Sequence, residues 1–195
     1  MADHVEGSAL LRQLLEGGNP RTLGNVGAVV ELVHAHPDRL DELISCVLGN
    51  DDEIVTMRAA DALEKVCRSD PALVQPHVPT LLGGMATIDQ PSVQWHVAQM
   101  LGQVRLTARQ RARAVRILRA NLDHSADWIV LNCSLDTLAT LARHDATLVE
   151  TLLAYLRRYQ HSSYKSLSSR AERLLTEFAS PDRTTSRARS PAPDR

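Results

Sequence analysis

The sequence predicts an all-α protein built from stacked pairs of helices. Residues 53–66 (E-I-V-T-M-R-A-A-D-A-L-E-K-V) form an amphipathic stretch that returns 38 residues later, at residues 92–104. A third copy follows about 37 residues further on, at residues 129–141. A period in the high thirties, with each copy opening a helix, is typical of helical-repeat proteins. Composition agrees, because 44% of residues are apolar but only 3% are aromatic, which favours closely packed helices over a β-sandwich or barrel.

The apolar positions of the repeat align from copy to copy. Matching positions are Met57/Trp95, Ala60/Ala98, Leu63/Leu101 and Val66/Val104, with Leu135, Leu138 and Leu141 in the third copy. The second helices agree independently, since D-A-T-L-V-E-T-L-L from Asp145 repeats D-P-A-L-V-Q-P-H-V from Asp70, about two periods earlier. Two independent matches argue against chance periodicity.

The elements follow in order from apolar spacing and end signals. A short helix over 8–16 ends at Gly17-Gly18-Asn19-Pro20, because Gly and Asn tolerate a left-handed cap and Pro cannot continue a helix. The predicted pairs are 25–34 with 37–48, 52–68 with 70–82, 91–104 with 107–122, and 127–143 with 145–159. A last helix over 163–178 has one apolar side, as a terminal cap does.

Local signals mark several helix starts and divide the chain. Asp70-Pro71 reads as an N-cap followed by Pro at the first helical position, and Thr107-x-x-Gln110 is a capping-box pattern. We therefore predict an N-terminal capping helix within 1–19 and a repeat domain over 20–178. Residues 179–195 are predicted to be a disordered basic tail, because they have no apolar periodicity.

The first helices resemble those of a known family. Met57-Arg58-Ala59-Ala60-Asp61-Ala62-Leu63 resembles the V-R-x-x-A-x-x-A-L pattern of HEAT repeats, and residues 97–102 are similar, including the Leu-Gly step. The resemblance covers roughly residues 20–178, although the period is shorter than the roughly 40–47 residues usual for HEAT arrays. It implies a right-handed α-α superhelix, or α-solenoid, of about four HEAT-like helical hairpins plus capping helices.

The resemblance also implies a class of function. HEAT-like repeats chiefly serve as scaffolds for protein recognition, which suggests a non-catalytic scaffold that binds a protein or peptide in its concave groove. The alternative is a nucleic-acid-binding protein resembling the HEAT-like alkylation-repair DNA glycosylases, and a third is a bilin-lyase-like protein. None of that glycosylase family's catalytic residues can be matched to positions here, so no catalytic residue is assigned.

Charge divides the chain in two. Residues 1–100 carry 6 Lys/Arg against 14 Asp/Glu, a net of −8, whereas residues 101–195 carry 16 against 9, a net of +7. Such asymmetry points to a partner. The acids at Asp38, Asp41, Glu42, Asp51, Asp52 and Glu53 are interpreted mainly as helix-start chemistry, with head-to-tail self-association as a weaker alternative.

The basic half provides the candidate binding residues. Arg109, Arg113 and Arg116 share one face of helix 107–122 at i, i+4 and i+7, with Arg105 just before it. The predicted buried stripe of that helix is Ala112, Val115, Leu118 and Leu122. Second helices line the concave surface of HEAT-like arrays, so this face and Arg157-Arg158 are predicted to form a basic patch in the groove.

The pattern allows three interpretations of that patch. An acidic protein surface and a nucleic-acid backbone both suit aligned cations, and a solvated face without a ligand explains the same spacing. The scarcity of aromatic residues and the overall net charge of −1 weaken the nucleic-acid interpretation. Trp128, at a helix start, is a candidate interface anchor, whereas Tyr155 and Tyr159 are predicted to pack.

Other functional classes have little support in the sequence. Cys46, Cys67 and Cys133 are far apart and are predicted to be reduced core thiols, and His34-Ala-His36 lacks further ligands for a metal. No nucleophile elbow or phosphate-binding glycine loop is present, so we expect no cofactor. Without a signal peptide or a long apolar run, the chain is expected to be cytoplasmic, away from membranes, and a monomer or weak homo-oligomer.

Overall fold

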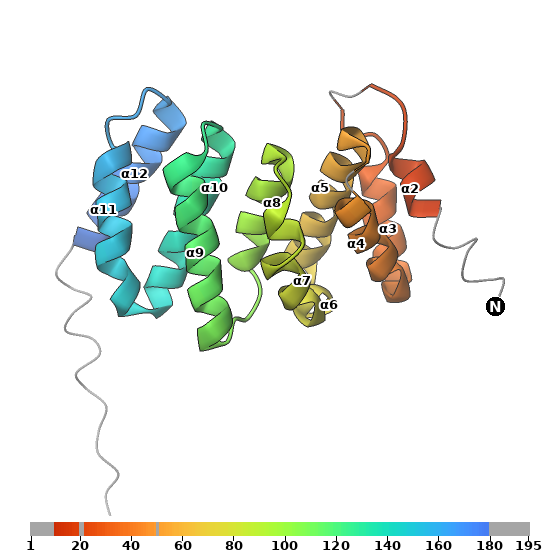
Figure 1. The fold of residues 1–195 in the computed structure, drawn as a ribbon, viewed down its shortest axis with the longest axis horizontal. Helices are drawn as coiled ribbons and strands as arrows, with labels where there is room; N and C mark the ends of the chain where they lie inside the picture. The colour runs from red at the N-terminus through yellow and green to blue at the C-terminus, as the bar shows by residue number, and fades with distance from the viewer. Residues whose placement is uncertain (1–9, 20–21, 50, 180–195) are drawn as a thin grey trace, which may run out of the picture.

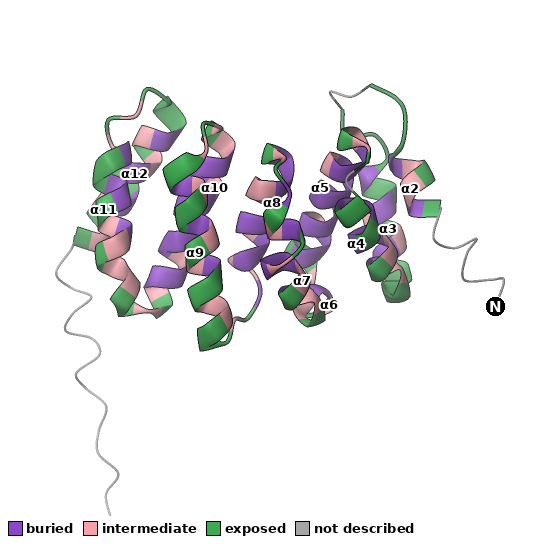
Figure 2. Cartoon of the chain, viewed as in Figure 1, coloured by how far each residue is buried: buried purple, intermediate pink, exposed green. Residues whose placement is uncertain are grey.

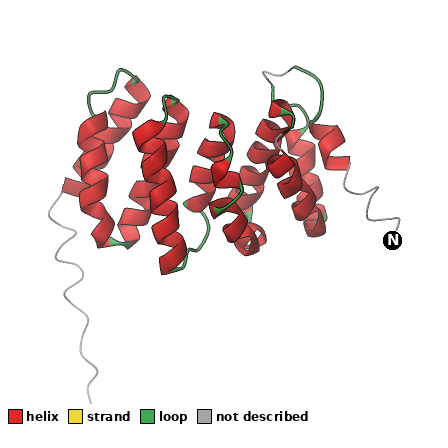
Figure 3. Cartoon of the chain, in the orientation of Figure 1, coloured by secondary structure: helices red, strands yellow, loops and turns green. Residues whose placement is uncertain are grey.

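The computed structural model describes residues 10–19, 22–49 and 51–179, and over these ranges the chain forms helices and no strand (Figure 3). The predicted all-α class is confirmed. The α-helices are α2 (Leu10–Leu15), α3 (Val26–Ala35), α4 (Leu40–Gly49), α5 (Glu53–Ser69), α6 (Pro71–Val74), α7 (Val78–Leu82), α8 (Pro91–Leu101), α9 (Ala108–His124), α10 (Trp128–His144), α11 (Val149–Tyr159) and α12 (Lys165–Ala179). The 3-10 turns are η1 (Pro37–Arg39), η2 (Gln75–His77), η3 (Met85–Thr87) and η4 (Ala146–Leu148).

The helices stand side by side in chain order along the long axis of the molecule (Figure 1). Helices α3, α5, α8, α10 and α12, the first helices of successive pairs, pack each against the next. The second helices are α4, the broken α6–α7, α9 and α11. Three of them, α4, α9 and α11, pack chiefly against the first helix that follows. Neighbouring pairs are therefore joined by their first helices and by the packing of a second helix on the next first helix, whereas second helices contact one another little.

Polar links between neighbouring pairs recur one period apart. The Thr137 hydroxyl donates to the Ala98 carbonyl over 2.8 Å, and the two residues are 39 positions apart. Gln103 Nε2 donates to Glu64 Oε1 over 2.8 Å across the same separation, and Gln90 Nε2 donates to the carbonyl of Glu53, 37 positions earlier, over 2.9 Å. The separations match the period read from the sequence, so these bonds fix the register of each pair on the next.

The core lies between the two sets of helices and runs the length of the row (Figure 2). Its members are mainly Leu, Val and Ala, as the composition predicts, and Tyr155 and Tyr159 are also buried within it. Cys46 and Cys67 are buried and all three cysteines are free, in agreement with the predicted core thiols. Small and branched apolar side chains allow the first helices to pack closely.

Side chains cap several helix starts, including the predicted N-cap Asp70, which accepts the Ala72 N–H. The Asp52 side chain accepts hydrogen bonds from the backbone N–H groups of Ile54 and Val55, and Asp127 caps α10 in the same way. Thr107 and Gln110 form the predicted capping box at the start of α9. These caps satisfy N–H groups that have no partner within the helix.

Several predicted bounds are wrong. The expected single helix over 70–82 is divided into α6, η2 and α7, because Pro76 and Pro79 have no N–H to donate within a helix. Helix α8 stops at Leu101 rather than at Val104, and α12 includes Ala179, which the prediction assigned to the tail. The predictions for residues 1–9 and 180–195 lie outside the described residues.

Candidate functional site

The predicted arginine face is on the exposed side of α9. Arg109, Arg113 and Arg116 are all exposed, and we call these three residues the arginine face. The predicted buried stripe is partly wrong, because Ala112 is exposed and Ala114 is buried with Leu118 and Leu122. Six residues span about 1.7 helical turns, so Ala112 cannot share a face with Leu118.

Most arginines in the described chain have partners. Those that bond or pair with a carbonyl or carboxylate are Arg12, Arg39, Arg58, Arg68, Arg111, Arg143, Arg158, Arg170 and Arg173. The side chains of Arg105, Arg109, Arg113, Arg116 and Arg157 make no hydrogen bond or ion pair with any described residue. Five of the six arginines predicted as binding residues therefore carry uncompensated charge.

The sixth predicted arginine is neutralised. Arg158 Nη1 lies 3.1 Å from Asp123 Oδ1, and its guanidinium lies over the Tyr159 ring at 5.3 Å. Asp123 also accepts the Tyr155 hydroxyl over 2.9 Å. This cluster lines a hollow of about 360 Å³ between α9 and α11, with Arg119 at its edge. Arg158 lines that hollow, but none of Arg105, Arg109, Arg113 and Arg116 does.

Arg105 is held at the N-terminal end of α9 by its backbone. Gln75 Nε2 donates to the Arg105 carbonyl over 2.8 Å, and Gln75 Oε1 accepts from the Arg105 N–H over 2.9 Å. The Arg105 side chain remains exposed. Both amide atoms of one side chain thus bind a neighbouring backbone, and they fix the turn from which α9 begins.

Trp128, the candidate interface anchor, is exposed but lies apart from the arginine face. It is 44% exposed at the first position of α10, beside Tyr164, which is also 44% exposed and whose hydroxyl reaches the Ala126 carbonyl at 3.5 Å. Helices α9 and α10 are antiparallel neighbours, so Trp128 lies near the C-terminal end of α9. Arg109 is about 22 Å away along the helix axis. The two predicted features are at opposite ends of one hairpin.

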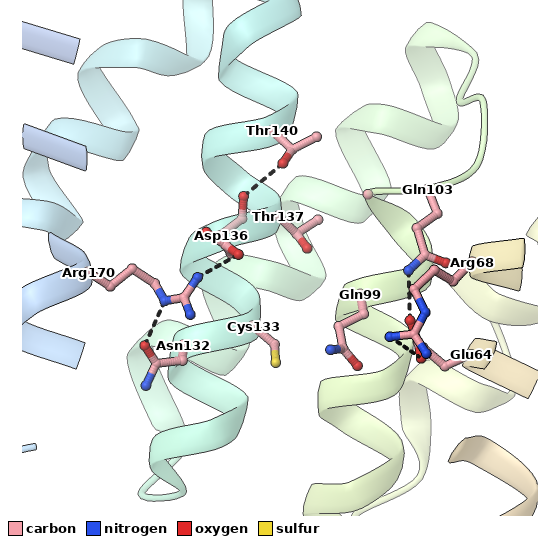
Figure 4. A pocket seen from close by; sticks show the side chains of 11 residues that line it. Glu64, Arg68, Gln99, Gln103, Asn132, Cys133, Asp136, Thr137, Thr140 and Arg170 are labelled. Carbon is pink, nitrogen blue, oxygen red and sulfur yellow. Dashed lines mark hydrogen bonds and ion pairs between the residues drawn. The ribbon is translucent and has the colours of Figure 1, made fainter. Parts of the chain in front are cut away.

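A second candidate site, which the sequence did not indicate, is a polar hollow on the first helices (Figure 4). It has a volume of about 310 Å³ and is lined from α5, α8, α10, α12 and the turn after α8. We call it the polar hollow. Residues important for its chemistry are Glu64, Arg68, Gln99, Gln103, Asn132, Asp136 and Arg170. It lies on the first helices, apart from the arginine face on α9.

Hydrogen bonds and ion pairs hold both walls of the polar hollow. Glu64, only 4% exposed, accepts Gln103 Nε2 over 2.8 Å and lies 3.8 Å from Arg68 Nη1. On the opposite wall, Arg170 donates through Nε to Asn132 Oδ1 over 2.9 Å and pairs with Asp136 Oδ2 at 2.5 Å. Figure 4 shows the two groups facing one another across the hollow.

A repeat of polar positions could have indicated this site. Asp61, Gln99 and Asp136 are one period apart, and so are Lys65, Gln103 and Thr140. On a single helix, such positions are indistinguishable from an ordinary solvated face. Only the packing of α8 against α10 brings Gln99, Gln103, Asp136 and Thr140 to one hollow.

Arg58, on another side of α5, binds main-chain carbonyls at the end of α2 and in the turns before α3. Its guanidinium is 1% exposed and donates to the carbonyls of Leu15, Gly17, Asn19 and Thr22 over 2.6–3.1 Å. These acceptors are all main-chain oxygens, and no carboxylate pairs with the arginine among the described residues. One side chain therefore fixes the segment between α2 and α3 against α5.

Burial changes the titration of two groups beside the polar hollow. Burial lowers the pKa of His96, while the nearby carboxylates of Asp61, whose Oδ1 is 3.7 Å from His96 Nε2, and Glu64 partly oppose this shift. Burial raises the pKa of the Cys133 thiol to about 11. At neutral pH the imidazole is therefore mainly uncharged and the thiol protonated, and neither is poised as a nucleophile.

The acidic N-terminal cluster is largely engaged within the chain. Asp51 accepts two hydrogen bonds from Arg12, at 2.9 and 3.0 Å, and Asp52 caps α5. Glu42 accepts the Leu11 N–H over 2.7 Å and pairs with Arg39. These carboxylates have internal roles, which weakens the alternative of head-to-tail self-association.

The part of the chain that the structure describes contains no group of three or more His, Cys, Asp or Glu side chains placed to hold a metal ion. Among the same residues, no helix combines the length and apolar character that crossing a membrane requires. Comparisons of the chain with protein-family models, with curated proteins and with solved structures found no match.

Proposed function

We propose that this chain is an α-solenoid of HEAT-like helix pairs that acts as a non-catalytic scaffold and binds an acidic protein or peptide on the arginine face. The stacking of first helices in chain order and the one-period links between pairs support the repeat architecture. The observation that carries the binding proposal is the uncompensated charge of Arg109, Arg113 and Arg116, in a chain whose other described arginines mostly have partners.

The spacing of the arginine face suits carboxylates on a regular partner. Arg109, Arg113 and Arg116 follow a single line over about 10 Å of helix, since each residue rises about 1.5 Å. Acids at i, i+4 and i+7 of a partner helix have the same spacing. Arg105 and Arg157 extend the uncompensated charge beyond this line. Such rim arginines chiefly steer association and fix orientation.

Nucleic acid remains the second candidate, because the same arginines would neutralise phosphates. Single-stranded ligands usually also require aromatic side chains on which bases stack. Trp128 and Tyr164, the most exposed aromatic residues described, lie at the far end of the α9–α10 hairpin from Arg109. This separation favours a protein partner.

Fluorescence anisotropy tests the proposal with a labelled 15-residue Glu-rich helical peptide, a Gln-for-Glu version, and duplex and single-stranded DNA. We expect the acidic peptide to bind, with log affinity falling as log salt concentration rises, and Arg113→Glu to weaken binding at least tenfold. Lys165→Glu is the matched control, because it makes the same charge change on an exposed side chain of α12, in the other helix layer, that forms no ion pair with any described residue.

Equal binding of the Glu and Gln peptides would refute an acidic partner. Binding of DNA alone, lost on converting Arg109, Arg113 and Arg116 to Glu, would establish the nucleic-acid alternative instead. The variants should unfold at nearly the same temperature as the native protein, because these side chains have no partner in the described chain.

A further inference from the structure

The polar hollow is not explained by the arginine face. Its lining residues belong to the first helices and to the turn after α8, whereas the arginine face belongs to the second helix α9. A partner on the arginine face would not contact the polar hollow. The polar hollow therefore needs an explanation of its own.

Its charges are balanced. Two carboxylates, Glu64 and Asp136, are accompanied by two guanidinium groups, Arg68 and Arg170. Amide side chains make up much of the remaining polar lining, at Gln99, Gln103 and Asn132. A polyanion would meet the carboxylates and an apolar ligand would leave charged groups unsolvated. A ligand with no net charge and with both donors and acceptors fits best, and an extended polypeptide main chain has these properties.

Part of the hydrogen-bonding capacity is unused. The Oε1 atom of Gln103 is sheltered from solvent and has no partner in the described chain. Gln99 uses Oε1 toward His96 Nδ1, at 3.1 Å, while its Nε2 donates to no described residue. The Gln103 amide oxygen therefore lacks a donor, and the Gln99 amide nitrogen lacks an acceptor. A peptide group supplies one of each, an N–H donor and a carbonyl acceptor.

The molecule already binds main chain in this way at two places. Arg58, on α5, binds the main-chain carbonyls of Leu15, Gly17, Asn19 and Thr22. Gln75 binds the N–H and the carbonyl of Arg105 with the two atoms of its amide. The side-chain types that line the polar hollow are therefore the types that recognise backbone elsewhere in this chain.

We propose that the polar hollow is a second binding site, which takes an extended, uncharged segment of a partner polypeptide and recognises it mainly through its backbone. Gln99 and Gln103 bind the segment where it passes α8. Asp136 and Arg170 bind it further along, where it passes α10 and α12. Packed helices lie about 8–10 Å apart, so a segment that crosses α5, α8, α10 and α12 covers about 24–30 Å. Extended chain spans this distance in about eight residues.

The test is selection of peptides from a displayed library of random 12-residue sequences on the full-length protein, followed by affinity measurement by calorimetry. We expect uncharged peptides to be enriched. Gln99→Met combined with Asp136→Asn should weaken binding of these peptides at least tenfold, because an amide and a carboxylate that contact the peptide are lost. The fold should be kept, because both side chains are partly exposed and the changes preserve their size. Arg113→Glu should leave the same peptides bound with unchanged affinity.

Backbone recognition makes a further demand on the selected peptides. Methylation of a central peptide nitrogen should weaken binding about tenfold, whereas replacing individual side chains by Ala should change it less than threefold. The side-chain amide NMR signals of Gln99 and Gln103 in the native protein should shift when the peptide is added. This second measurement does not depend on the folding of any variant.

Three results would overturn the proposal. The first is failure to enrich any peptide. The second is enrichment of peptides whose affinity is unaffected by the Gln99→Met and Asp136→Asn changes and which leave the two amide NMR signals unshifted. The third is loss of peptide binding in Arg113→Glu. The last result would assign the peptides to the arginine face. It would leave the proposed function intact, so the two proposals fail separately.

Discussion

Thr137 caps a helix to which it does not belong. Its hydroxyl, buried on α10, donates over 2.8 Å to the carbonyl of Ala98 on α8. Ala98 is one of the last four residues of α8, and the carbonyls of these residues receive no hydrogen bond from a later N–H of a regular helix. The Gly102 N–H, which would be the donor to Ala98, bonds to the carbonyl of Gln99 instead. The end of one first helix is therefore stabilised by the middle of the next.

Thr137→Val should lower the free energy of unfolding by about 1–3 kcal/mol, because it keeps the shape but leaves a buried carbonyl without a donor. Urea denaturation measures this loss. Thr140→Val is the control, since the Thr140 hydroxyl bonds only within α10, donating to the Asp136 carbonyl and accepting from Arg143 Nη1 over 3.3 Å, and its loss should cost less than about 0.5 kcal/mol. Similar losses for both variants would show that the α8–α10 bond has no special role.

Arg58→Met should destabilise the protein by at least about 3 kcal/mol, because several buried main-chain carbonyls lose a charged donor. We also expect α2 to become the fastest-exchanging helix in hydrogen-exchange measurements, since the segment that joins it to α3 is no longer held. Arg68→Met, on the same helix with a side chain 62% exposed, should change stability little. Unchanged protection of α2 in Arg58→Met would contradict this account.

His96 should make the protein less stable in mild acid. Burial lowers its pKa in the folded state, so the unfolded chain binds a proton more readily as pH falls through about 6.5. The free energy of unfolding should therefore be higher at pH 7.5 than at pH 5.5. His96→Asn should reduce this difference, because the other histidines are common to both proteins. An equal or steeper pH dependence in the variant would show that Asp61 and Glu64 outweigh burial.

The thiols should react slowly in the native protein. Burial raises the pKa of Cys46 to about 11 and that of Cys67 to about 12, so little thiolate forms at pH 8. Cys133, which is less buried and lines the polar hollow, should react first with a disulfide reagent. All three should react rapidly in denaturant. A peptide seated in the polar hollow should slow Cys133 alone, which can be followed by mass spectrometry.

The sequence predicted what depends on local pattern. Helix starts at Asp52, Thr107 and Asp127 could be predicted, because a cap needs only a few neighbouring residues. The exposure of Arg109, Arg113 and Arg116 followed from helical spacing. The break at Pro76 and Pro79 was missed because the apolar spacing of the segment is helical even though its backbone cannot be.

The polar hollow could not be predicted in the same way. Gln99 and Asp136 are 37 residues apart, and each looks like an ordinary solvated position on its own helix. Likewise, nothing near Arg58 in the sequence indicates that its acceptors are carbonyls some 40 residues earlier. Contacts of this kind depend on the register between helix pairs, which the period suggests but does not specify atom by atom.

Because the first helices pack against one another while the second helices contact one another little, we expect the first-helix side of the row to be stiffer than the second-helix side. Few packed side chains resist a force that separates α9 from α11. They are chiefly the cluster of Asp123, Tyr155 and Arg158. A load that separates α8 from α10 must unpack the core and break the Thr137 bond. The molecule should therefore bend so that the distances between second helices change while those between first helices stay nearly constant. A partner held across the second helices would act as a brace and reduce this bending.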